Sequence, residues 1–68
     1  MRIELARADS VRVGDYVQGW QQTTFDPVFE WKSLEDDSLE IQYRQHPMCT
    51  IGRVYRHGSD MILIGRSE

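Results

Sequence analysis

Residues 39–44 have the sequence Leu-Glu-Ile-Gln-Tyr-Arg, in which apolar and polar side chains alternate. Successive side chains of a β-strand point to opposite faces, so this period of two predicts a half-buried strand. The side chains expected to face a core are Leu39, Ile41 and Tyr43. This is the clearest strand pattern in the chain, and it indicates a fold built from strands.

The segment before this strand predicts a second strand over residues 28–34, with Phe29 and Trp31 on its core side. Residues 35–38, Glu-Asp-Asp-Ser, predict the turn between the two strands. A helix over residues 33–42 is the competing interpretation, because its first residues resemble a weak capping box. The leucines of this segment are not spaced for a helical stripe, which favours the strands.

The N-terminal part predicts shorter elements. Ile3 and Leu5 alternate with charged residues, as in a short first strand. Residues 11–17 predict a strand segment that turns at residues 14–15, a Gly-Asp pair. Residues 21–27 are polar and end in Asp-Pro, where the proline disfavours a helix in the preceding residue, so we expect a loop.

The C-terminal part predicts a hairpin. His46-Pro47 ends the strand at residues 39–44, because proline cannot donate to a sheet ladder, and residues 48–56 predict the next strand. Gly58-Ser59 is typical of a two-residue hairpin loop. The pairs opposed in that register are Val54 with Leu63, Tyr55 with Ile62, and Arg56 with Met61. The last strand is then apolar on both sides, so one side needs a loop, barrel closure or a partner chain to cover it.

Five or six short strands with turn signals every 8 to 12 residues predict an all-β fold, a small antiparallel β-barrel. The chain has 68 residues, which suits a single domain spanning 1–68. Its strand rhythm and the segment Val11-Arg12-Val13-Gly14-Asp15 resemble SH3-like and similar small β-barrels, which often enter a strand through a Gly-Asp turn. The resemblance concerns the fold alone, and such folds serve many unrelated functions.

The composition indicates a soluble, folded protein of the cytoplasm. Hydrophobic residues make up 40% of the chain and charged residues 28%, which is too apolar for a disordered tail. The longest apolar run, residues 61–64, is far short of the roughly 20 residues that cross a bilayer, so we expect no membrane association. The single cysteine, Cys49, excludes an internal disulfide and indicates a reducing compartment. Because so small a domain gains stability from further burial, we also expect a homodimer.

The charge is unevenly distributed along the chain. The formal net charge is −3. Up to residue 42, four basic residues stand against nine acidic ones, a balance of −5. From residue 43 onward, four arginines stand against two acidic residues, a balance of +2. If the parts separate in space, either one could be a binding face.

The sequence predicts no enzyme, no metal site and no cofactor. The residues that come nearest to a metal or nucleophile set are His46, Cys49, His57 and Asp60. They lack the second ligand pair of a zinc site and the glycine-rich elbow of a nucleophilic hydrolase. A second group of carboxylates, Glu35, Asp36, Asp37 and Glu40, lacks the alternating ligands and central glycine of a calcium loop. We interpret it as a solvated turn.

Aromatic and arginine side chains are the best candidates for a binding site, because they supply most hot spots in protein interfaces. The expected partner-binding residues are Trp20, Phe25, Arg53, Arg56 and His57. Small proteins without enzymatic motifs are common in phages and mobile elements, where they often inhibit a host factor. We therefore expect a protein-binding module of that kind. The alternatives are single-stranded DNA or RNA binding by similar residues, and a structural component of a larger assembly.

Overall fold

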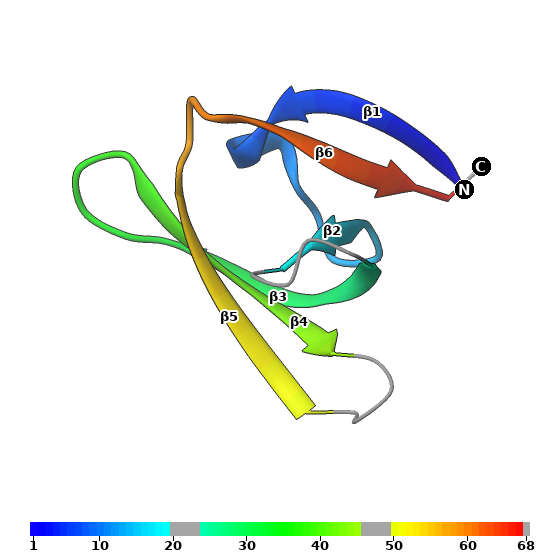
Figure 1. Cartoon of the computed structure of the whole chain (residues 1–68). Coiled ribbons are helices and arrows are strands. Elements are labelled where there is room, and N and C mark those ends of the chain that lie inside the picture. Colours follow the sequence, from blue (N-terminus) through cyan, green and yellow to red (C-terminus); the bar gives the residue numbers. More distant parts are fainter. Residues whose placement is uncertain (20–23, 46–49, 68) are drawn as a thin grey trace.

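Six β-strands and one 3-10 turn make up the structure, a computed structural model that describes residues 1–19, 24–45 and 50–67 (Figure 1). The elements are β1 (Arg2–Arg7), η1 (Ala8–Ser10), β2 (Tyr16–Gln18), β3 (Phe25–Ser33), β4 (Ser38–Gln45), β5 (Thr50–His57) and β6 (Met61–Arg66). All six strands are antiparallel neighbours in one sheet of order β1-β6-β2-β3-β4-β5. The all-β prediction is confirmed, but in the described part of the chain no ladder joins β1 to β5, so the sheet is not closed.

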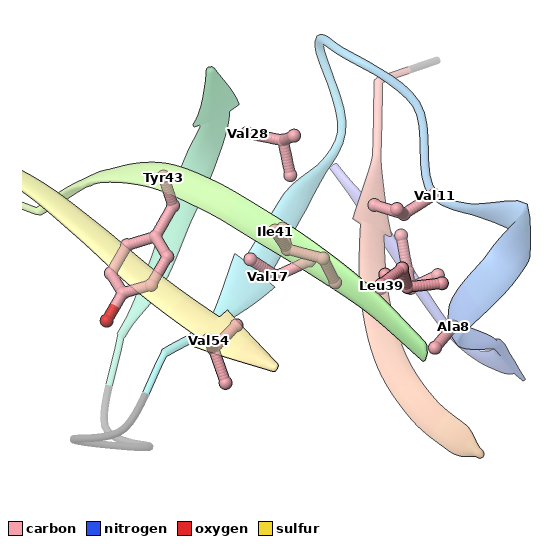
Figure 2. Close-up of a cluster of buried hydrophobic side chains, with 9 residues drawn as sticks. Ala8, Val11, Val17, Val28, Leu39, Ile41, Tyr43 and Val54 are labelled. Carbon is pink, nitrogen blue, oxygen red and sulfur yellow. The ribbon is translucent and has the colours of Figure 1, made fainter. Parts of the chain in front are cut away.

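The sheet bends so that its two ends enclose one core. Figure 1 shows β1 and β6 on one side of the molecule and β3, β4 and β5 on the other. Nine apolar residues between them are buried: Ala8, Val11, Val17, Val28, Leu39, Ile41, Tyr43, Val54 and Ile64 (Figure 2). Among the described residues, no helix is long and apolar enough to cross a bilayer.

Strand β4 lies in the middle of the β3-β4-β5 part of the sheet. Its predicted core residues Leu39, Ile41 and Tyr43 are 3%, 0% and 1% exposed, which confirms them as core residues. The prediction of a half-buried strand is wrong, because Glu40 and Gln42 on the other face are buried as well. The helix alternative for residues 33–42 is wrong, because this segment forms the end of β3, a turn and the start of β4. The predicted turn is confirmed by the Ser38 amide, which donates to the carbonyl of Glu35.

A β-bulge in β3 changes which side chains reach the core. Val28 pairs with Tyr43 but Glu30 pairs with Gln42, so Phe29 is an extra residue in the strand. Phe29 is 50% exposed, and its prediction as a core residue is wrong. Trp31, beyond the bulge, returns to the inner face and packs partly buried against the core.

The N-terminal elements are shorter than the sequence pattern predicts. The Gly-Asp turn is confirmed: the amide of Arg12 donates to the Asp15 carboxylate at 2.9 Å, and Gly14 has a φ of 101°. However, β2 begins only after this turn. The loop expected over residues 21–27 is also too long, because β3 starts at Phe25 and includes the Asp-Pro pair. The extended conformation that proline imposes on the residue before it suits a strand as well as a loop.

The predicted hairpin between β5 and β6 is wrong, although its turn exists. The amide of Asp60 donates to the carbonyl of His57 at 3.0 Å, closing the turn at residues 58–59. Beyond it the strands separate: Val54 pairs with Ile41 of β4, and Leu63 pairs with Leu5 of β1. The opposed pairs expected between β5 and β6 are therefore not formed.

Backbone hydrogen bonds at the turn explain this separation. The Gly58 amide donates to the carbonyl of Asp37 at 2.6 Å, and the Gly58 carbonyl accepts from the Asp9 amide at 3.1 Å. The Asp60 carbonyl accepts from the Ala8 amide at 2.7 Å. The turn is thus tied to the β3–β4 turn on one side and to η1 on the other. This corner directs β6 towards β1 instead of back along β5.

We predict that Gly52→Ala destabilises the protein. Gly52 lies opposite Tyr43 on β5, and a Cβ at this position would overlap the buried tyrosine ring. Overpacking of this kind costs about 2 kcal/mol, so the midpoint of urea unfolding should fall clearly. Thr50→Ala, at an exposed position of the same strand, should leave the midpoint nearly unchanged. Equal midpoints for Gly52→Ala and the unmodified protein would show that the ring does not occupy this space.

Candidate functional site

A cleft opens where β5 and β6 separate after the corner. It is a cavity of about 200 Å³ lined by Val17, Gln18, Ile41, Val54, Arg56, Ile62 and Leu63. Ile41 and Val54 form part of an apolar floor that continues into the core. Arg56 is the only charged residue among the described residues of the lining. We call this cavity the β5–β6 cleft.

Both strands that flank the β5–β6 cleft have backbone without a described strand partner on one side. In the described ladders, β5 pairs with β4 alone. Strand β2 reaches β6 only at Ile64 and Gly65, so in these ladders residues 61–63 pair with β1 and with no strand on their other side. Free strand edges of this kind can accept an added strand through main-chain hydrogen bonds.

A second cavity adjoins the cleft at the corner. It has a volume of about 160 Å³ and is lined by Ser38, Tyr55, Arg56, His57 and Asp60. Arg56 lines both cavities, and its Nη1 donates to the carbonyl of Tyr55 at 3.0 Å. The Asp60 carboxylate accepts from the amide of His57 at 3.0 Å, which fixes this end of β5.

The structure separates the residues that the sequence grouped into one binding site. Arg56 lies in the β5–β6 cleft, and His57 lies in the adjoining cavity. Phe25 pairs with Gln18, which lines the cleft, so it lies one strand away. Arg53 is three positions from Arg56 and therefore faces the other side of β5. Trp20 lies outside the described residues.

Glu40 is the centre of a polar cluster on the outer face of the sheet. Its Oε1 accepts from Nε2 of Gln42 at 2.6 Å, and its carboxylate also accepts from the Tyr55 hydroxyl. Lys32 Nζ and Arg53 Nε each lie 3.9 Å from the same Oε1. Glu40 and Arg53 come from the acidic and basic parts of the chain, so the structure brings these parts together. The cluster links three strands and leaves the Glu40 side chain 12% exposed.

The hydrogen bonds of this cluster shift two pKa values in opposite directions. The Gln42 amide, and after it the Tyr55 hydroxyl, hold the pKa of Glu40 below its ordinary value. The bond to the Glu40 carboxylate raises the pKa of Tyr55. No sequence pattern indicates this cluster. Glu40 lies close to the acidic turn in the sequence, so the sequence groups it with the carboxylates of that turn. Its partners on β3 and β5 become neighbours only once the register is known.

The outer face also exposes aromatic side chains beside arginine. Phe29 is 50% exposed and Tyr55 is 58% exposed. The guanidinium of Arg44 lies 5.8 Å from the centre of the Phe29 ring, a cation–π distance. The bulge in β3 is what brings Phe29 to this face. A planar ligand could stack on these rings, with the cations of the face near its charged groups.

Within residues 1–19, 24–45 and 50–67, no group of three or more His, Cys, Asp or Glu side chains is placed to hold a metal ion. Two of the candidates from the sequence, His46 and Cys49, lie outside these residues. Comparison of the chain with protein-family models, with curated proteins and with solved structures gives no match. The function therefore has to be inferred from the cleft and the outer face themselves.

We predict that Glu40→Gln reduces the loss of stability in acid. Because the pKa of Glu40 is lower in the folded protein, its charge stabilises the fold above the unfolded pKa of about 4.3. This contribution is lost as the pH falls through the lower folded pKa. Urea midpoints measured from neutral pH down to acid should therefore fall less steeply in Glu40→Gln than in the unmodified protein.

Glu35→Gln is the matched control for this measurement, because it removes a carboxylate from the exposed β3–β4 turn and leaves the cluster intact. It should keep the acid dependence of the unmodified protein. The same steep acid dependence in Glu40→Gln would contradict the role given to Glu40.

Proposed function

We propose that the protein is a non-enzymatic protein-binding module that takes up an extended segment of its partner in the β5–β6 cleft. The observation that supports this function is a cleft with an aliphatic floor, flanked by two strands with free edges. An extended peptide can pair its backbone with such an edge while alternate side chains enter the cleft. Binding of this kind requires no catalytic group and no cofactor.

The cleft indicates what the bound segment should contain. Its floor, which includes Ile41 and Val54, favours an aliphatic or aromatic side chain. Arg56 at the junction of the two cavities favours a carboxylate next to that side chain. A segment bound beside β5 would also cover the open side of the core. That arrangement would resemble the small SH3-like barrel expected from the sequence.

The kind of partner is proposed from size and composition alone. A stretch of 68 residues with no catalytic motif has the character of a small phage or mobile-element accessory protein. On this analogy the partner is a host protein whose activity changes on binding. An extended segment of that protein, such as a loop or a terminus, would be the part that enters the cleft.

We predict that Arg56→Glu weakens peptide binding and that Arg53→Glu does not. Peptides selected on the immobilised protein from a random display library should contain an apolar residue beside an acidic one. Arg56→Glu should weaken them by about tenfold or more, or about 1.4 kcal/mol, because it reverses the charge at the cleft. Fluorescence anisotropy of the labelled peptides would measure this loss.

Arg53→Glu is the matched control, since it makes the same change on the same strand but on the opposite face of the sheet. Selection of no peptide, or equal weakening by both variants, would reject the β5–β6 cleft as the binding site.

Single-stranded nucleic acid is the second candidate ligand, and exposed Phe29 and Tyr55 on the outer face favour it. Bases stack on such rings while arginines contact phosphates. Titration with short DNA and RNA at about 50 and 200 mM salt should then show salt-sensitive binding. Phe29→Ala should weaken that binding and Arg56→Glu should not. Absence of binding at the lower salt would reject this candidate.

A further inference from the structure

Strands β1 and β6 expose four large apolar side chains on their outward face. Leu5 pairs with Leu63 and Arg7 pairs with Met61, so these side chains are direct neighbours. Ile3, Leu5, Met61 and Leu63 are 49%, 61%, 55% and 43% exposed. Single exposed apolar residues are ordinary, but four on two adjacent strands indicate an interaction surface. We call these four residues the β1–β6 patch.

The patch ends at a free strand edge. β1 is the first strand of the sheet and has a described ladder only with β6. Just beyond β1, the amide of Ala8 donates to the carbonyl of Asp60, which precedes β6. The even-numbered residues of β1 therefore point their backbone N–H and C=O groups towards β6. In an antiparallel ladder these directions alternate, so the backbone groups of Ile3, Leu5 and Arg7 point away from the sheet. They are free to pair with another strand.

We propose that this edge binds a second copy of the chain, with the two β1 strands antiparallel about a two-fold axis at Ile3. Ile3 then lies opposite Ile3 of the partner copy. Arg2 of each copy lies opposite Glu4 of the other, so each Glu4 carboxylate, which already lies 3.1 Å from Arg66 Nε and 3.5 Å from Arg2 Nη2 of its own chain, gains the arginine of the second copy. An interface of this kind uses the same surface twice, as a two-fold dimer must. The patches of both copies join into one apolar surface across the axis.

Charge selects this register over its neighbours. Registers that keep the patch on one face differ by two residues. The next register places Glu4 opposite Glu4, a like-charge pair that destabilises a ladder. The following register, centred on Leu5, places Arg7 opposite Ile3. In it neither Arg2 nor Glu4 lies opposite a residue of opposite charge. Only the register centred on Ile3 opposes Arg2 with Glu4 and keeps Ile3 and Leu5 among apolar residues.

The proposed dimer and the peptide site use different strand edges, although Leu63 both lines the β5–β6 cleft and belongs to the β1–β6 patch. β1 and β5 are at opposite ends of the strand order, so pairing through β1 leaves the free edge of β5 available. The first test is the mass of the protein by light scattering across a concentration series. The unmodified protein should approach the mass of a dimer as its concentration rises. A monomer at every concentration would overturn the proposal.

Charge reversal tests the ion pairs. Arg2→Glu sets a carboxylate opposite Glu4 of the other copy and should shift the protein to monomer. Arg2 is 63% exposed, so the fold should tolerate the change. Ile3→Glu should also give monomer, and Val13→Glu, at an exposed apolar residue away from β1, should remain dimeric. Dimers that persist in both Arg2→Glu and Ile3→Glu would overturn the proposal.

Disulfide trapping tests the register. In a Cys49→Ser background, Ile3→Cys should form a cross-linked dimer on mild oxidation. Residue 3 of one copy lies opposite residue 3 of the other, with about 5.5 Å between their Cα atoms, a distance that suits a disulfide. Leu5→Cys should cross-link much less, because Leu5 lies opposite Met1 of the other copy. Preferential cross-linking through Leu5→Cys would overturn the register centred on Ile3.

Discussion

The backbone hydrogen bonds at the corner after β5 determine the main features of the molecule. The amide and carbonyl of Gly58 bind Asp37 and Asp9, so the turn belongs to a junction of three segments. A free Gly-Ser turn would have returned β6 along β5. The junction sends β6 to β1 instead, which leaves β5 with one described neighbour and opens the β5–β6 cleft. The free edge of β5 and the cleft beside it both follow from the direction that β6 takes.

The parts of the fold that could be predicted are those determined by neighbours in sequence. Strand β4 is recognisable because its alternation continues without interruption and its apolar residues all reach one core. The turns at residues 14–15 and 35–38 are recognisable from side chains that favour turns. Both residues at the tip of the second turn, Asp36 and Asp37, have positive φ angles near 60°, a conformation that aspartate tolerates better than most residues.

The parts that could not be predicted depend on contacts between distant segments. The bulge at Phe29 inserts one residue in β3, and no local pattern indicates it. The separation of β5 from β6 depends on hydrogen bonds with η1 and the β3–β4 turn. The grouping of the candidate site residues was wrong for a local reason, which the period of two of a strand already implies. Arg53 and Arg56 are close in sequence, but three positions along a strand put them on opposite faces, so only Arg56 enters the cleft.

The ladder between β1 and β6 has a consequence for how the chain folds. It pairs Arg2 with Arg66, so the first strand finds its only described neighbour in the last one. Such long-range pairing slows folding, because the entropy of closing a large loop is lost before the ladder stabilises it. During synthesis β1 must wait, unpaired and apolar on one face, until β6 leaves the ribosome. Growing chains are therefore most exposed to aggregation just before β6 emerges.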